Sequence, residues 1–190
     1  MNLPRLELKL EPILKEDYIT LHPFTGWSFY KEWPVNRWEE LIARIQEDSE
    51  IPVKFIQIGT PNETKLAGCD HSYMGRPLMD SINLIANAKL HMGGDSFSNH
   101  TTHLTGTPGV ILWGSTQASA SGYEENINIS LGLPCQPCFK ESPHVSSMSR
   151  GVCENPPGQT YDNPKHKCMH DITVDMVYDK LCEILGNKPL

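Results

Sequence analysis

The chain has 190 residues, of which 38% are hydrophobic, so it is long enough to bury one substantial core without disulfides. Its net charge of −7 and the absence of any run of lysines or arginines argue against a nucleic-acid binder. No apolar stretch approaches the roughly 18 residues of a membrane span, and the start lacks the apolar core of a signal peptide, so we expect a cytoplasmic protein with reduced thiols.

The first half of the sequence predicts a strand, a helix and a second strand. Residues 1–17 alternate charged residues with leucines and contain two prolines, which indicates an arm or linker before a domain at 18–190. Runs of β-branched and aromatic residues at 18–23 and 53–59 end in turn residues, as strands do. A helix is expected after Pro34, because apolar residues recur there at helical spacing. Its apolar stripe consists of Trp38, Leu41, Ile42 and Ile45.

The same alternation continues toward the C-terminus. A second helix is predicted at 77–88, followed by strands at "KLHMG" and at 109–114. The last helix, 173–185, carries one apolar stripe and has Thr173 as its expected N-cap. Alternating strands and helices predict an α/β fold, with a parallel sheet and helices on both of its faces.

Residues 132–170 do not fit this alternation, because they combine prolines, glycines and serines with four of the six cysteines. Four thiolates are the number that a tetrahedral structural metal requires, and a metal can order a segment that lacks a core. The ligands would be Cys135, Cys138, Cys153 and Cys168. Zinc is the default ion, and thiolates also accept iron. The alternatives are unconnected thiols, a redox Cys-x-x-Cys pair, or a site in which a flanking histidine replaces one cysteine. Those histidines are His144, His166 and His170.

The segment "GGDSFSNHTTHLTGTPGVILWG", 93–114, places a polar run at a predicted strand end. Two glycines allow close backbone approach to a ligand, Asp95 or Ser96 can cap the next helix, and the N–H groups near Phe97 and Ser98 would favour an anion such as a diphosphate. Three other interpretations remain: a nucleophilic serine, a metal held by two histidines, and an ordinary capped helix. The two histidines are His100 and His103.

The same segment resembles the D-[ST]-x-x-x-H … G-T-P signature of glycosyltransferase family 9, the ADP-heptose heptosyltransferases. "LHPFTGWSFYKEWPVNRWEEL" and "IQIGTPNE" resemble two further segments of that family in the same order. "LPCQPCF" and "CMHDITVDMV" resemble the tail of its autotransporter heptosyltransferases, which holds iron with four cysteines. The likeness covers roughly residues 18–185.

The resemblance implies that the chain is the C-terminal, donor-binding half of a GT-B fold, a Rossmann-like domain with the Cys-rich metal-binding segment as an insertion. It implies Lys31 at the diphosphate, Glu63 at the ribose and Asp95 at the sugar, with Lys31 and Asp95 as the catalytic residues. The residues expected at the nucleotide sugar are His22, Thr25, Gly26, Lys31, Glu63, Gly94, Asp95, Ser96, Phe97, Ser98 and His100. Phe97 stands where the family usually has glycine, which bears on how the sugar or phosphate fits.

The expected function is therefore transfer of heptose from ADP-heptose, with inversion, to a protein hydroxyl or a lipopolysaccharide sugar. The expected cofactor is one iron or zinc ion, and the expected partner is an acceptor-binding domain or further copies of the chain. No residue matches the family's general base, which lies in its N-terminal domain. The alternatives are a donor-binding fragment without catalytic activity and a metal-stabilised interaction module that needs a partner.

Overall fold

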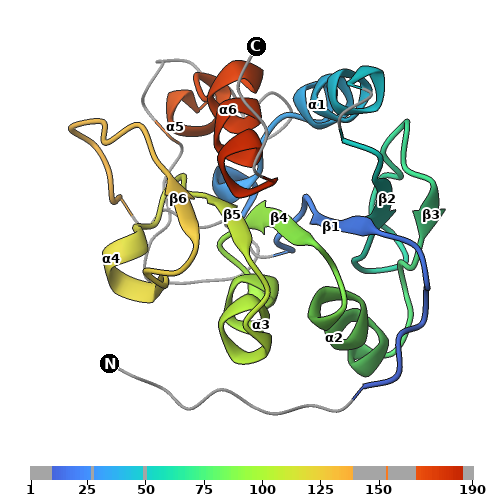
Figure 1. The fold of residues 1–190 in the computed structure, drawn as a ribbon. Helices are drawn as coiled ribbons and strands as arrows, with labels where there is room; N and C mark the ends of the chain where they lie inside the picture. Colours follow the sequence, from blue (N-terminus) through green and yellow to red (C-terminus); the bar gives the residue numbers. More distant parts are fainter. Residues whose placement is uncertain (1–9, 27, 49–50, 139–152, 154–165, 186–190) are drawn as a thin grey trace.

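The computed structural model describes residues 10–26, 28–48, 51–138, 153 and 166–185. Within them, a six-stranded parallel sheet has the strand order β3-β2-β1-β4-β5-β6 (Figure 1). The strands are β1 (Tyr18–His22), β2 (Lys54–Gln57), β3 (His71–Ser72), β4 (Leu90–Gly94), β5 (Gly109–Leu112) and β6 (Ile127–Ile129). The predicted α/β parallel sheet is confirmed.

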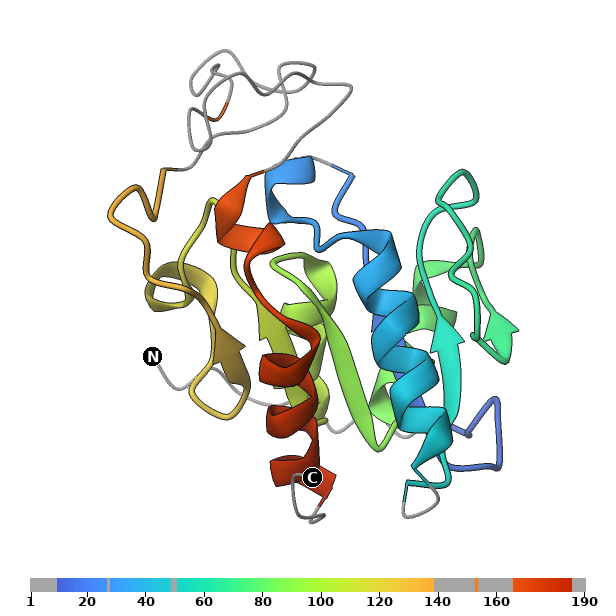
Figure 2. The same ribbon diagram turned by 90° about the horizontal axis from the view of Figure 1, so that it is seen from above.

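Helices cover both faces of the sheet, as the alternating pattern predicted (Figure 1). On one face lie α1 (Val35–Glu47), α5 (Lys167–His170) and α6 (Val174–Leu185), and Figure 2 shows α1 and α6 side by side over the strands. On the other face lie α2 (Leu78–Ala86) and α3 (Phe97–Thr105). The short α4 (Ala118–Ser121) lies between β5 and β6, and a 3-10 turn, η1 (Phe29–Lys31), precedes α1.

Helix α1 begins directly after Pro34, whose fixed φ suits the start of a helix. Its predicted apolar stripe is buried against the sheet: Trp38, Leu41, Ile42 and Ile45 are each at most 1% exposed. Helix α6 packs on the same face, and the backbone N–H of Met176 donates to Thr173 Oγ1 at 3.2 Å, which confirms Thr173 as the N-cap.

A second, smaller core fills the opposite face, where Tyr18 and Ile56 from the strands meet Leu84 and Ile85 from α2. Because helices cover both faces of the sheet, every residue of the central strands β1 and β4 is buried. Helix α3 ends at Thr105 and is capped by Gly106, which has φ +74°, a left-handed conformation that glycine adopts without strain. Among the described helices, none is long and apolar enough to cross a membrane.

The strand order places β1 and β4 next to each other at the point where the chain reverses its direction of winding. The chain runs outward from β1 through β2 to β3, then returns to β4 and continues outward the other way to β6. In open parallel sheets a crevice forms outside the carboxyl ends of the strands at such a switch point. Here β1 ends at His22, which pairs in register with Gly93, the next-to-last residue of β4.

Candidate functional site

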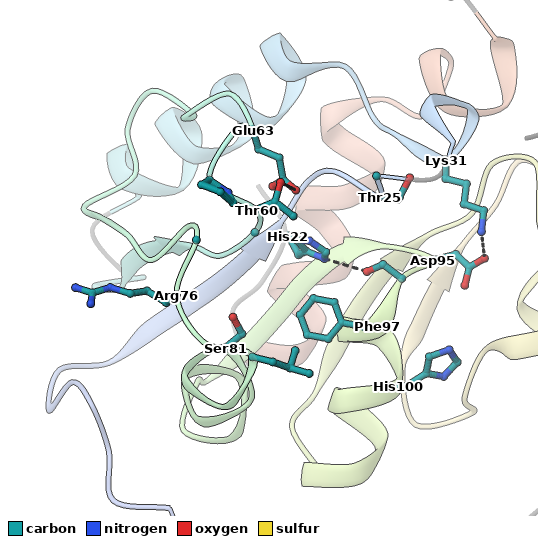
Figure 3. Close-up of a pocket in the computed structure, with 16 residues that line it drawn as sticks. His22, Thr25, Lys31, Thr60, Glu63, Arg76, Ser81, Asp95, Phe97 and His100 are labelled. Atoms are coloured by element: carbon teal, nitrogen blue, oxygen red, sulfur yellow. Dashed lines mark hydrogen bonds and ion pairs between the residues drawn. The ribbon is translucent and has the colours of Figure 1, made fainter. Parts of the chain in front are cut away.

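A pocket of about 690 Å³ opens at this switch point (Figure 3). Its walls come from the carboxyl ends of β1 and β4, the loops that follow β2 and β3, and the first turns of α2 and α3. The lining residues are His22, Thr25, Gly26, Lys31, Gly59, Thr60, Pro61, Glu63, Gly75, Arg76, Leu78, Ser81, Asp95, Ser96, Phe97 and His100.

An ion pair joins two sides of the pocket. Lys31 Nζ donates to Asp95 Oδ2 at 2.9 Å, with the side chains 18% and 9% exposed (Figure 3). The other carboxylate oxygen of Asp95 accepts a hydrogen bond from Ser121 Oγ at 3.4 Å. Because both oxygens have partners, the carboxylate has a fixed orientation beside the lysine.

Lys31 is placed by a loop that is hydrogen-bonded within itself. Thr25 Oγ1 donates to Ser28 O at 2.9 Å, and the Thr25 N–H donates to Glu32 Oε1 at 3.0 Å. Burial raises the pKa of the Glu32 carboxyl. The loop also requires glycine at position 94, because a Cβ there would lie only 2.9 Å from Lys31 O. Gly94 therefore permits the close approach of η1 to the end of β4.

His22 closes the floor of the pocket at the end of β1. Its Nδ1 lies 3.0 Å from Ser96 Oγ and 3.3 Å from Ser98 Oγ, and the two hydroxyls are 2.9 Å apart. Its ring meets Phe97 edge to face at 5.0 Å. Burial lowers the pKa of His22 to about 4, so the ring is neutral at pH 7.

The N-terminus of α3 lies beside these groups. Ser96 occupies the N-cap position with extended backbone, but its side chain makes no capping hydrogen bond. Its hydroxyl instead contacts His22 and Ser98, so the expected cap is present by position and not by side chain. The first turn of α3 thus brings the positive end of a helix dipole to the pocket, a favourable place for an anion.

Glu63 supplies an acceptor on the β2 side of the pocket. Its Oε1 accepts a hydrogen bond from Thr60 Oγ1 at 3.0 Å, whereas its Oε2 is buried and has no hydrogen-bond partner among the described residues. A Cβ at Gly59 would collide with that carboxylate, and Gly59 has φ +152°. A buried carboxylate oxygen without a donor is costly, so it is suited to accept a hydroxyl of a ligand.

The structure brings together, around one pocket, all the residues expected at the nucleotide sugar except Gly94 and Ser98. Gly94 lies behind the wall, against Lys31 O, and Ser98 is fully buried beneath His22. The Nδ1 atoms of the two histidines considered as metal ligands have different partners: that of His100 contacts the Tyr123 hydroxyl, and that of His103 contacts Glu125.

Sequence reasoning missed the lining residues that precede and begin α2. They are Gly59, Thr60, Pro61, Gly75, Arg76, Leu78 and Ser81. The available signal was the run Gly75-Arg76-Pro77, in which a glycine at φ +72° and a proline mark a turn directly before a helix. In Figure 3 the guanidinium of Arg76 points away from Lys31 and Asp95.

None of the four clustered cysteines forms a disulfide. Burial raises the pKa of Cys168 to about 12, and Cys138, Cys153 and Cys135 raise it further. The Cys153 N–H also donates to the hydroxyl of Tyr30 in η1, at 3.1 Å. Across the described part of the chain, which includes all four of these cysteines, no group of three or more His, Cys, Asp or Glu is arranged to hold a metal ion, so the predicted four-Cys site is not assembled in this structure. Residues 139–152 and 154–165 of the Cys-rich segment, with His144, lie outside the described residues, as do residues 1–9 of the expected arm.

Solved structures show the same fold. An iron-containing dodecameric glycosyltransferase, TibC from enterotoxigenic E. coli H10407, superposes with a TM-score of 0.76 at 16% identity, over 96% of this chain and 48% of that one. TibC in complex with ADP-D-beta-D-heptose gives 0.75 at 15% identity, over 96% and 48%. The E. coli ADP-heptose lipopolysaccharide heptosyltransferase II gives 0.63 at 18% identity, over 90% and 47%. The chain thus spans about half the length of these proteins.

No curated protein sequence matches the chain. The family model for glycosyltransferase family 9 (heptosyltransferase) matches residues 3–148, which is most of the chain and includes the segments that build the pocket. The chain therefore belongs to glycosyltransferase family 9, the heptosyltransferases.

Proposed function

We propose that this chain is the donor-binding half of a GT-B glycosyltransferase and that its pocket holds ADP-heptose. The observation that carries the proposal is the convergence of Lys31, Glu63 and the N-terminus of α3 on one pocket at the switch point. A lysine and a helix N-terminus suit a diphosphate, and a carboxylate oxygen without a donor suits a ribose hydroxyl. Family membership and the ADP-heptose complex of TibC support the choice of donor.

Each side of the pocket takes one part of the donor in this proposal. Lys31 and the first turn of α3, from Ser96 to Ser98, face the diphosphate, and Glu63 takes the ribose. Asp95, paired with Lys31, faces the junction between the diphosphate and the sugar, and His100 lies close behind it (Figure 3). The other predicted donor-site residues shape the walls and the backbone behind them: His22, Thr25, Gly26, Gly94 and Phe97.

The proposed reaction transfers the heptose with inversion to a protein hydroxyl or a lipopolysaccharide sugar. The acceptor oxygen bonds to the anomeric carbon from the face opposite the diphosphate, and the bond from that carbon to the diphosphate breaks. Lys31 and the helix N-terminus stabilise the departing charge. The acceptor's proton goes to a base of the acceptor-binding half, because Asp95 is already paired with Lys31 and Ser121.

The proposal requires a partner for the domain at residues 18–190. An acceptor-binding domain, or further copies of the chain, would complete the site in the cytoplasm. The solved relatives that match are about twice as long, and TibC is described as dodecameric.

We also propose that Cys135, Cys138, Cys153 and Cys168 hold one metal ion, iron by resemblance or zinc by ligand chemistry. Four thiols are a suitable donor set for either ion, and the charges of the other three contribute to the raised pKa of Cys168. When bound, the ion would supply a structural cross-link and lower the pKa of the thiols that ligate it. The iron-containing character of TibC supports iron.

The alternatives differ in what they bind and catalyse. A donor-binding fragment would bind ADP-heptose without transferring the sugar, even when an acceptor domain is supplied. A metal-stabilised interaction module would bind no nucleotide. Titration calorimetry of the purified chain with ADP separates the second alternative from the proposal, and a transfer assay with the acceptor domain added separates the first.

The residue-level test is Lys31→Ala. Loss of a charged hydrogen bond to phosphate is expected to weaken ADP binding by about 2 kcal/mol, or roughly thirtyfold. The matched control is Lys89→Ala, because Lys89 pairs with Asp17 at the opposite ends of β1 and β4. Equal ADP affinity in the parent and Lys31→Ala, or no ADP binding by the parent, contradicts the assignment.

A further inference from the structure

The loop between α4 and β6 carries Tyr123, an aromatic residue that contacts His100 of the pocket wall. His100 lines the pocket, but its ring is exposed, so burial does not set its orientation. Its Nδ1 lies 2.9 Å from the hydroxyl of Tyr123, and the two rings meet edge to face at 5.7 Å and 90°. Tyr123 does not itself line the pocket.

Tyr123 is held in place from its other side. Its ring stacks on that of His103 at 4.1 Å, with the planes only 7° apart. His103 is largely buried, and its Nδ1 is hydrogen-bonded to the carboxylate of Glu125, two residues after the tyrosine. His100 and His103 are three residues apart on α3 and share one face of the helix, so the tyrosine ring spans both.

Buried amides anchor the loop that carries Tyr123. Asn126 Nδ2 donates to Asn99 Oδ1 at 3.1 Å and to Thr102 Oγ1 at 2.9 Å. Asn99 Nδ2 in turn donates to Ser121 O at 2.9 Å. Asn99 and Asn126 are 0% and 5% exposed, so moving the loop away would leave buried amide groups without partners. The hydroxyl of Tyr123 is thus presented to His100 from a fixed frame.

We propose that Tyr123 is a positioning residue: its hydroxyl donates to His100 Nδ1 and so keeps the His100 proton on Nε2, as a donor to the anionic ligand of the pocket. A neutral imidazole that accepts at Nδ1 carries its proton on Nε2. Burial and the neighbouring Glu125 raise the pKa of Tyr123, which keeps the phenol protonated. The identity of the ligand, ADP or its sugar conjugate, rests on the function proposed above.

The first test is ¹⁵N NMR of the histidine side chains at pH 8, without ligand, with the His100 signals assigned from their loss in His100→Ala. The expected result is one tautomer with the proton on Nε2 in the parent and a shift toward a tautomer mixture in Tyr123→Phe, which retains the ring. The matched control is Tyr178→Phe, which removes the hydrogen bond to Asp48 Oδ2 between α6 and α1. A proton on Nδ1 in the parent, or an unchanged spectrum in Tyr123→Phe, overturns the inference.

The second test measures ADP binding by calorimetry. Tyr123→Phe is expected to weaken binding about fivefold, in line with the loss of one oriented hydrogen bond. Adding it to His100→Ala should cost nothing more, because the tyrosine acts through that ring. If the parent does not bind ADP, the proposed function fails while the NMR test still stands. If the parent binds and Tyr123→Phe binds equally well, only the inference fails.

Discussion

Lys31 Nζ lies 2.9 Å from Asp95 Oδ2, and this pair connects the turn before α1 to the junction between β4 and α3. The two residues are 64 positions apart in the sequence, and each follows a strand end at the switch point. The lysine that we assign to the diphosphate is therefore already paired with a carboxylate. A diphosphate that enters the pocket must share Lys31 with Asp95 or displace Asp95 from it.

Asp95→Asn is expected to bind ADP more tightly than the parent. The substitution removes a negative charge beside the diphosphate and frees Lys31, and for partly exposed groups this is worth about 1 kcal/mol, or roughly fivefold in affinity. Calorimetry with ADP at low and high salt measures the effect, which should diminish as salt increases.

The control for this change is Asp70→Asn. Asp70 also pairs with a lysine at 2.9 Å, Lys54, but at the start of β2 and away from the pocket. Its variant should bind ADP as the parent does. Weaker binding by Asp95→Asn would mean that Asp95 does not lie beside the diphosphate.

The main elements of the fold could be predicted because their residues repeat at regular spacing. The apolar stripe of α1 and the apolar runs of β1, β2 and β5 carry that signal in their own residues. Strand β3 was missed because it consists of two exposed polar residues, His71 and Ser72, which carry no apolar pattern. It exists because the Asp70 and Tyr73 N–H groups donate to Phe55 O and Gln57 O of β2.

The predicted and missed parts of the pocket differ in where they lie in the chain. Lys31, Glu63 and Asp95 belong to short motifs at strand ends, which are visible in the sequence. Arg76 and Ser81 reach the pocket because the chain between β2 and α2 folds back over it, and no periodic pattern specifies such a path. The contact between Tyr123 and His100 was equally hidden, because it depends on buried amides in two separate elements.

Glu63→Ala is expected to remove the preference of the protein for the ribose hydroxyls. The parent should bind ADP about tenfold more tightly than 2′,3′-dideoxy-ADP, since the buried Oε2 accepts a hydroxyl only from ADP. Glu63→Ala should bind the two nucleotides equally. Competition experiments with both nucleotides measure the ratio directly.

For comparison, Glu183→Ala should retain the tenfold ratio. Glu183 is an exposed residue of α6 that pairs with Lys180. If Glu63→Ala discriminates between the nucleotides as strongly as the parent does, the ribose lies elsewhere.

The stability of the fold is expected to decrease on acidification because several described histidines are buried with lowered pKa values, among them one at the end of β1 and one in β4. Burial lowers the pKa of His22 to about 4, and burial together with the nearby His22 lowers that of His91 to about 3. An unfolded histidine has a pKa of about 6.5, so below that pH the unfolded chain binds protons that the folded chain does not. Stability is therefore fully present above pH 6.5 and is lost progressively as the pH falls toward 4.

At pH 5 each of these histidines should cost about 2 kcal/mol of unfolding free energy relative to pH 7.5. Urea unfolding of the parent and of His91→Gln at both pH values isolates one of the two contributions. The loss should be about 2 kcal/mol smaller in His91→Gln, whatever its stability at pH 7.5. Met92→Leu, a change at the next buried position of β4, should show the loss of the parent. Equal losses in the parent and His91→Gln would show that His91 is not held neutral.

Cys168→Ser is expected to reduce the metal content of the purified protein. Cys168 lies in α5, and burial, followed by the three other thiols, raises its pKa to about 12, so without a cation it stays protonated. We expect elemental analysis to find about one iron or zinc ion per parent chain and well under half of that in Cys168→Ser. Cys182→Ser is the matched control, because Cys182 is also a buried thiol of the same core cluster but lies in α6, outside the Cys-rich segment. It should lose stability and keep its metal. A parent chain with well under one metal ion, or equal metal in the two serine variants, would mean that the four thiols are not a metal site.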